Sequence, residues 1–135
     1  MEAPEPLYRV AVEVRFRDLD AYGHVNNAVL FSYLEAARVR FLGDRFSVKP
    51  QADDLVFLVK RAECEYEQPI PLLDRVFVEL HVGELGSSSF RLSYDIRDDS
   101  GTRYARAETV MVAVSPRTGR PARLPWWLRQ KLDSP

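Results

Sequence analysis

The sequence predicts an α+β fold in which a curled antiparallel sheet of five strands wraps around one long helix, followed by a short C-terminal helix. Three observations predict it. The chain has 135 residues, the usual length of one domain, so we expect residues 1–135 to form a single domain. Polar and apolar residues alternate in five separate stretches, which is the pattern of half-buried strands. One further long stretch has apolar residues at spacings of three and four, which is the pattern of a helix.

The first strand is predicted over residues 8–18, where four apolar residues alternate with more polar ones: Val10, Val12, Val14 and Phe16. Residues 18–27 then interrupt the alternation with side chains that favour turns and helix caps. A helix is predicted from Ala28 to about Leu42. Its apolar face consists of Leu30, Leu34, Ala37 and Phe41. We expect Gly43 to end this helix.

Four more strands are predicted over residues 55–67, 76–82, 90–96 and 104–115. Prolines, glycines and aspartates separate them, so we interpret the four as an antiparallel meander. A short helix is predicted from Pro125 to Leu132, because proline is favoured in the first helical turn. The longer predicted strands should make the sheet curl. The open edge of the sheet is covered most simply by a second copy of the chain.

The charge balance and the single cysteine exclude several classes of protein. There are 19 basic and 20 acidic side chains, and the net charge of −1 argues against a protein that coats nucleic acid or an anionic membrane. Cys64 alone permits no internal disulfide and no cysteine-rich metal site, which fits the reducing cytosol. The sequence has no apolar run of about 18 residues and no signal-peptide pattern. We therefore expect a soluble, cytoplasmic protein that binds no metal, membrane or nucleic acid.

The segment between the first strand and the helix concentrates the reactive side chains, which are Asp18, Asp20, Tyr22, His24, Asn26 and Asn27. It brings carboxylates and an imidazole to the N-terminus of the helix, where free backbone N–H groups favour developing negative charge. A carbonyl group polarised there, beside a carboxylate, is an arrangement for acyl transfer. Aspartates and asparagines before a helix are also its most common caps, and a histidine in a turn is usually solvated. The residue pattern leaves both interpretations open.

A wider set of motifs resembles one enzyme family. Residues 14–27 and 33–38 closely resemble the 4-hydroxybenzoyl-CoA thioesterase-like branch of the hotdog-fold superfamily. The specific part is Asp18-Leu-Asp-Ala-Tyr-Gly-His-Val-Asn-Asn27, and the resemblance continues through residues 61–69, 74–78, 86–89 and 118–125. The resemblance implies the hotdog fold and the hydrolysis of an acyl thioester of coenzyme A or of acyl carrier protein. It implies no cofactor beyond the coenzyme A of the substrate, and it implies a homodimer at least, with a homotetramer as the expected assembly.

The resemblance implies three catalytic residues. Asp20 matches the family's catalytic carboxylate, which either attacks the thioester carbonyl or activates water as a general base. Asn27 aligns with the helix start whose backbone N–H faces the thioester oxygen. His24 matches a histidine that orients water or protonates the departing thiolate, with a hydrogen bond inside the loop as an equal alternative. We expect Asp18 instead to hold the loop through hydrogen bonds to the backbone.

The resemblance also implies a set of substrate-binding residues: Gly23, Val25, Asn26, Phe57, Leu58, Val59, Lys60, Ser88, Ser89 and Arg91. Residues 57–59 match the strand of a partner subunit that lines the acyl pocket, with an ordinary core role as the alternative. Ser88 and Ser89 match a turn that meets the pantetheine arm. The phosphates of coenzyme A need cations, and the candidates are Lys60, Arg61, Arg91, Arg117, Arg120 and Arg123.

Two residues outside the motif loop are expected to have other roles. We expect Glu35, on the predicted helix, to be structural and paired with Arg38 or with a neighbouring strand. We expect His81, in the middle of a predicted strand, to have a packing or surface role.

Two other functions compete with thioester hydrolysis. A hotdog hydratase would carry an Asp-x-Asn-x-x-His or a His-Phe-Pro pattern. Neither is present, since position 22 is a tyrosine and the spacing from Asp20 to His24 is one residue too short. A non-catalytic module would bind acyl thioesters, or another protein, without turnover. The aromatic residues of the predicted helix and second strand fit a fatty acyl group and an aromatic one equally.

Overall fold

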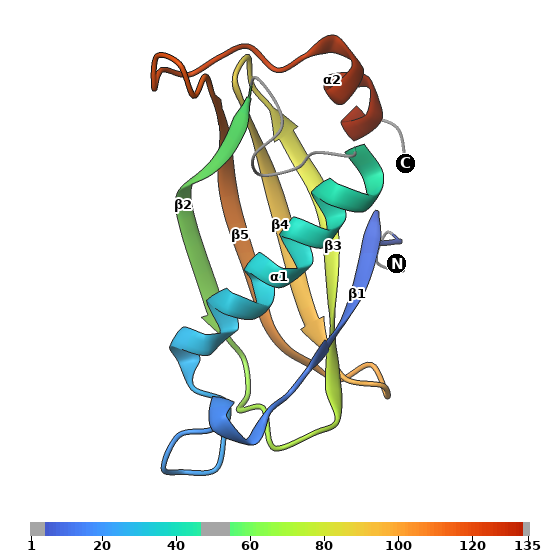
Figure 1. The fold of residues 1–135 in the computed structure, drawn as a ribbon. Helices are drawn as coiled ribbons and strands as arrows, with labels where there is room; N and C mark the ends of the chain where they lie inside the picture. Colours follow the sequence, from blue (N-terminus) through green and yellow to red (C-terminus); the bar gives the residue numbers. More distant parts are fainter. Residues whose placement is uncertain (1–4, 47–54, 134–135) are drawn as a thin grey trace.

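The structure, a computed structural model, describes residues 5–46 and 55–133, and the described residues form one antiparallel sheet curled around a long helix (Figure 1). This is the fold class that the sequence predicts. The elements in chain order are β1 (Tyr8–Glu13), the short 3₁₀ helix η1 (Phe16–Asp18), α1 (Asn27–Phe46), β2 (Val56–Tyr66), β3 (Arg75–Leu85), β4 (Ser89–Arg97), β5 (Arg103–Val114) and α2 (Trp126–Asp133). In this part of the chain, no helix is both long enough and apolar enough to cross a membrane.

The order of the strands in the sheet is β1-β3-β4-β5-β2, so the expected four-strand meander is wrong in one place. The strands β3, β4 and β5 do follow one another, but β2 pairs with β5 at the far edge. Because β1 and β4 occupy the two edges of β3, no edge of β3 is free for β2. The register between β2 and β5 shifts between Val59 and Arg61, which makes Lys60 the extra residue of a β-bulge.

The concave face of the sheet packs against α1 and forms the core. Alternate residues of β3 and β4 point to this face and are fully buried, as their alternation predicts: Val76, Val78, Leu80, Phe90, Leu92 and Ile96. The helix contributes the face predicted from its spacing, and all four residues are buried: Leu30, Leu34, Ala37 and Phe41. At one end of the molecule, α2 adds Leu128 and Leu132 to the same core (Figure 1).

Two element boundaries differ by more than three residues from those predicted. The first strand ends at Glu13, because the chain then turns into η1, where the Asp18 carboxylate accepts a hydrogen bond from the Arg15 N–H at 3.0 Å. Phe16 therefore lies outside the strand and is 79% exposed. Gly43 does not end α1, which continues to residue 46. A glycine costs a helix interior only about 1 kcal/mol, and the burial of Phe41 in the preceding turn offsets this cost.

The convex face of the sheet carries charged residues that pair across strands. Glu79 of β3 lies 3.5 Å from the Arg9 side chain of β1 and 2.9 Å from the Arg97 side chain of β4. His81 lies on the same face, with its Nε2 atom 3.8 Å from an Asp95 oxygen. This placement agrees with the surface role expected for His81.

Candidate active site

The loop between η1 and α1 is a tight turn that places Asp20 beside the start of the helix. The Asp20 N–H donates to the His24 carbonyl oxygen at 2.8 Å. Gly23 turns the chain with a φ of +79°, a conformation that favours glycine. The Asn26 N–H donates to the Asp18 carbonyl oxygen at 2.9 Å, which closes the loop against η1. Gly23 thus shapes the backbone around the candidate catalytic residues.

The two aspartates of the loop have different partners. Asp18 accepts a hydrogen bond from the Tyr33 hydroxyl at 2.7 Å, and burial together with this bond raises the pKa of Tyr33 well above its ordinary value. The Asp20 carboxylate is exposed, and its Oδ1 atom accepts the N–H groups of Tyr22 at 2.9 Å and His24 at 3.4 Å. No described residue donates to its Oδ2 atom. Asp18 thus holds the loop to α1, whereas the Asp20 carboxylate accepts hydrogen bonds, among the described residues, from N–H groups of its own loop alone.

The start of α1 is capped by one asparagine and open at the next. The Asn26 side chain accepts a hydrogen bond from the Ala28 N–H at 2.8 Å, the usual role of a helix cap. The Asn27 N–H donates to no acceptor among the described residues, and the Asn27 carbonyl accepts the hydroxyl of Tyr66 at 3.0 Å. The last residue of β2 therefore holds the helix start in place, and the free N–H of Asn27 remains available to a ligand.

These groups share a cavity of about 360 Å³, which we call the loop cavity. Its lining contains the three predicted catalytic residues, together with Val25 of the predicted binding set. The full lining is Asp20, Tyr22, His24, Val25, Asn27, Leu30, Tyr66, Glu67, Gln68, Pro69 and Ile70. The last five come from the end of β2 and the segment after it. Nothing in the sequence pattern pointed to Tyr66 or Gln68, because only the pairing of β2 with β5 brings them to the helix start.

A second cavity, of about 400 Å³, lies between the middle of α1 and the start of β2, and we call it the helix cavity. It is lined by Glu35, Arg38, Val39, Leu42, Leu55, Val56, Phe57, Leu58, Val59 and Met111. The predicted acyl-pocket residues 57–59 are thus together, with the Phe57 ring packed edge-on against Phe90 at 5.8 Å between ring centres. Lys60, the bulge residue, is exposed and lines neither cavity.

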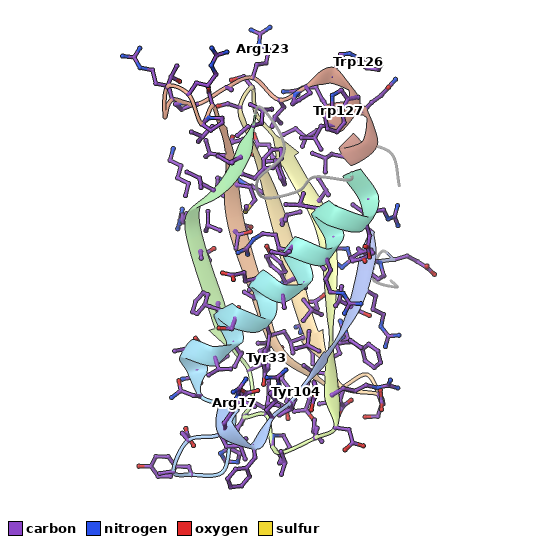
Figure 2. The ribbon with its side chains drawn as sticks, in the orientation of Figure 1. Arg17, Tyr33, Tyr104, Arg123, Trp126 and Trp127 are labelled. Atoms are coloured by element: carbon purple, nitrogen blue, oxygen red, sulfur yellow. The ribbon has the colours of Figure 1, made fainter. Side chains whose placement is uncertain are left out.

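The other predicted binding residues lie at the opposite end of the protomer from the loop cavity. Ser88 is in the turn between β3 and β4, at the end where α2 packs (Figure 1), and its carbonyl oxygen accepts the Ala113 N–H at 2.8 Å. Arg91 pairs with Glu108 at 2.5 Å, so its charge is already balanced. Figure 2 shows Arg123 at this end as well, far from Tyr33 and Arg17 beside the loop. Within one protomer, Ser88, Ser89 and the arginines do not meet Asp20.

Two titratable groups at or next to the end of β2 are unsuited to catalysis. Hydrogen bonds from Arg103 at 2.7 and 3.0 Å hold the pKa of Glu67 below its ordinary value, so this carboxylate stays ionised and occupied. Burial raises the pKa of the Cys64 thiol, so it is protonated near neutral pH. Among the described residues, the open carboxylate of the loop cavity is that of Asp20.

Comparisons with known proteins show the family to which this chain is similar over most of its length. Residues 14–132 match the model of the thioesterase-like superfamily. A solved structure of a thioesterase from Thermus thermophilus, complexed with coenzyme A and zinc, is 42% identical with a TM-score of 0.79, and the match covers 92% of this chain and 90% of that chain. The long-chain acyl-CoA thioesterase FadM of Escherichia coli K12 is 31% identical, over 90% of this chain and 94% of that protein. The acyl-CoA thioester hydrolase YbgC of Escherichia coli O6:H1 is 29% identical, over 88% and 90% respectively.

Proposed function

Because this chain belongs to the thioesterase-like superfamily, we propose that it hydrolyses acyl-CoA thioesters with Asp20 and the N-terminus of α1 as its reactive groups. The chain is an acyl-CoA thioesterase with the hotdog fold. One observation carries the assignment of the site: the open oxygen of Asp20 and the free N–H of Asn27 border the same cavity of about 360 Å³. A thioester in this cavity meets a carboxylate and a hydrogen-bond donor together.

The helix start stabilises the charge that the reaction develops. The Asn27 N–H donates to the thioester carbonyl oxygen, and the dipole of α1 favours the negative charge that forms there. Two backbone N–H groups hold Oδ1 of Asp20, which leaves Oδ2 free to react. His24 borders the same cavity and protonates the departing thiolate.

Two routes to the products use the same Asp20 oxygen. In the first, Oδ2 bonds to the thioester carbonyl carbon, the C–S bond breaks and a mixed anhydride forms, which water then hydrolyses. In the second, Oδ2 takes a proton from a water molecule that attacks the carbonyl carbon directly. Both routes release the free acid and the thiol and restore the carboxylate.

The active form is a homodimer that pairs two copies of β2. This strand ends the sheet with an unpaired edge, and most of its residues are exposed. Leu58 and Val59 of β2 and Val39 of α1 form an exposed apolar strip beside that edge. A second copy satisfies the free backbone groups and covers the strip. In an antiparallel pair, the start of one β2 lies beside the end of the other, so the loop cavity of one copy faces the helix cavity of the other.

The same pairing supplies cations for the substrate phosphates. Arg117, Arg120 and Arg123, which we call the arginine loop, are exposed and have no ion pair among the described residues. The segment between β5 and α2 that carries them lies at the end of the protomer opposite to the loop cavity (Figure 1), and Figure 2 shows Arg123 there. The antiparallel dimer brings the arginine loop of one copy to the loop cavity of the other, where it binds the phosphates of coenzyme A. Acyl carrier protein presents a thioester on a similar phosphate-bearing arm and is the alternative carrier.

Asp20→Asn tests the proposal, because the amide oxygen still accepts the two loop N–H groups but neither attacks a carbonyl nor takes a proton. We expect turnover to fall by about 10²- to 10⁴-fold, with thermal unfolding and assembly unchanged. The substrates are short, long and aromatic acyl-CoAs and one acyl carrier protein thioester. Asp99→Asn, at an exposed carboxylate of the β4–β5 turn, is the matched control. Full turnover in Asp20→Asn overturns the site, and binding without turnover in the wild type favours the non-catalytic module.

A further inference from the structure

We propose that the helix cavity selects acyl groups that end in a carboxylate and that Arg38 is the residue that binds this second acid group. The inference rests on the proposed thioesterase function and names its substrate class. It begins from the burial of one charge. Arg38 is 8% exposed, and it is the only buried residue with a formal charge in the part of the chain that the structure describes. A buried charge is costly unless it is paired.

The expected partner of Arg38 does not pair with it. Glu35 lies three residues earlier on α1 and is exposed, and no ion pair joins the two residues within 4.0 Å. The Arg38 Nη1 atom instead donates a long hydrogen bond of 3.4 Å to the Tyr94 hydroxyl. The Tyr94 hydroxyl is in turn 2.6 Å from the Thr109 hydroxyl. These neutral groups orient the guanidinium, but they do not balance its charge.

Arg38 lines the helix cavity, and part of its guanidinium is unpaired among the described residues. Every fully enclosed side-chain nitrogen or oxygen among the described residues has a hydrogen-bond partner. The Arg38 nitrogens that donate to no described acceptor therefore reach open space, and Arg38 lines the cavity of about 400 Å³. Apart from the exposed Glu35, which forms no ion pair with Arg38, the walls around it are apolar, with Leu42, Phe57 and Met111 among them. A cavity with apolar walls and one forked cation fits a methylene chain that ends in a carboxylate, which an arginine binds through two parallel hydrogen bonds.

The position of Arg38 sets a minimum reach for the acyl chain. Both cavities lie between α1 and β2, with Asn27 at one end and Arg38 eleven residues further along the helix. Eleven residues of α-helix rise about 16 Å, and a long side chain leans back toward the helix N-terminus and shortens this span. A chain bound within one copy must cross most of that distance, so a medium-length diacid chain fits better than a short one. In the dimer that pairs two copies of β2, the helix cavity of the other copy also contains Arg38, at a different distance from Asn27.

The test compares matched pairs of substrates that differ only in a terminal methyl against a terminal carboxylate. The pairs are hexanoyl-CoA with adipyl-CoA, octanoyl-CoA with suberyl-CoA, and dodecanoyl-CoA with dodecanedioyl-CoA. For the wild type, we expect kcat/KM to be at least tenfold higher for the carboxylate member of at least one pair. Arg38→Met keeps the length and the apolar stem and removes the charge, and we expect it to lower that ratio at least tenfold, mainly through KM. Arg40→Met, at an exposed position two residues away, is the control and keeps the wild-type ratio.

The outcomes separate this inference from the proposed function. A wild type that hydrolyses the methyl substrates and prefers no carboxylate substrate overturns the inference and leaves the thioesterase function intact. A folded Arg38→Met that keeps the wild-type ratio also overturns it. If Arg38→Met fails to give a cooperative thermal transition, the kcat/KM ratios of the wild type decide the test. A comparison of inhibition of the wild type by free suberate with inhibition by free octanoate is then the second measurement. Turnover of none of the six esters overturns the inference, and turnover of the aromatic acyl-CoA or of the acyl carrier protein thioester then decides whether the proposed function stands.

Discussion

At the scale of single residues, the different roles proposed for the two aspartates follow from what each carboxylate binds and from where it lies. Asp18 uses its Oδ2 atom to accept both the Tyr33 hydroxyl and the Arg15 N–H. Asp20 uses Oδ1 for backbone N–H groups and keeps Oδ2 open. Each aspartate keeps one oxygen that accepts no hydrogen bond from a described residue, so their location separates them: Asp20 lines the loop cavity and Asp18 does not. Residue type alone does not distinguish the two.

Tyr33→Phe tests the structural role of Asp18 without touching either carboxylate. The change removes the 2.7 Å hydrogen bond from the hydroxyl and leaves the Asp18 oxygen with one donor fewer in a partly buried place. We expect the free energy of unfolding to fall by about 1 kcal/mol, measured by urea denaturation, with kcat/KM within a few-fold of the wild type. Tyr22→Phe, at a ring that is 86% exposed, is the control for the free energy of unfolding. A loss of turnover as large as that of Asp20→Asn would contradict the separation of roles.

Residues close in the chain were predictable at this scale, and residues brought together by folding were not. Asp20, His24 and Asn27 stand within one motif, so the sequence places them together before any strand pairing is known. Tyr66 reaches Asn27 across 39 positions, and its role depends on where β2 enters the sheet. The burial of Arg38 was likewise hidden, because a glutamate three residues away on a helix predicts an exposed pair.

At the scale of elements, the start of α1 has to be rigid if its N–H groups are to meet a substrate. Asn26→Ala removes the side-chain oxygen that accepts the Ala28 N–H at 2.8 Å. We expect stability to fall by about 1 kcal/mol, and turnover to fall because the first helical turn frays and Asn27 loses its fixed position. Asn26→Asp is the matched variant, since aspartate caps a helix as well as asparagine does, and it should restore both. Equal turnover in Asn26→Ala and the wild type would show that the cap does not position the site.

The turn between β4 and β5 predicts a defined response to acid. Hydrogen bonds from the Tyr104 hydroxyl at 2.8 Å and from Ser100 lower the pKa of Asp98 to about 2. Since the unfolded value is about 3.9, the ionised carboxylate stabilises the fold above roughly pH 4, and this contribution is lost as the pH falls through the folded pKa. We expect Asp98→Asn to unfold at lower urea than the wild type at pH 7, and the difference to shrink between about pH 4 and pH 2. Asp99→Asn is the control, and a difference that is constant down to pH 2 would contradict the assignment.

The strands illustrate why alternation predicts elements but not their neighbours. The alternation over residues 76–82 and 90–96 marks strands whose buried faces the structure confirms. Alternation is a local pattern, however, and it contains no statement about which edges pair. The prediction of a meander was wrong at β2 because β1 pairs with the edge of β3 that a meander would give to β2. The residues paired between β1 and β3 are about seventy positions apart in the chain. The early end of β1 has a local cause, the η1 turn that Asp18 holds, and could have been anticipated from that carboxylate.

At the scale of the whole molecule, the proposed function needs two groups of residues that lie at opposite ends of one protomer. The loop cavity has the reactive groups, and the arginine loop has the cations that phosphates require. No motion within a protomer that keeps the sheet intact brings them together. A two-fold axis at the edge of β2 exchanges the two ends of the sheet. It therefore brings the arginine loop of each copy to the loop cavity of the other. The proposed dimer therefore makes each site from two chains, and this sharing can be measured by mixing two inactive variants.

One variant is Asp20→Asn, and the other replaces the arginine loop by Arg117→Ala, Arg120→Ala and Arg123→Ala together. We expect each alone to lose most of its turnover at substrate concentrations below KM, the second through a higher KM for coenzyme A esters. Unfolding and refolding an equimolar mixture gives about half mixed dimers, each with one intact site, so turnover should recover to about a quarter of the wild-type value. Simple mixing without exchange of subunits is the control. If the arginines served the loop cavity of their own chain, both sites of a mixed dimer would be damaged, and the absence of recovery in mixtures shown by mass to contain mixed dimers would exclude the shared site.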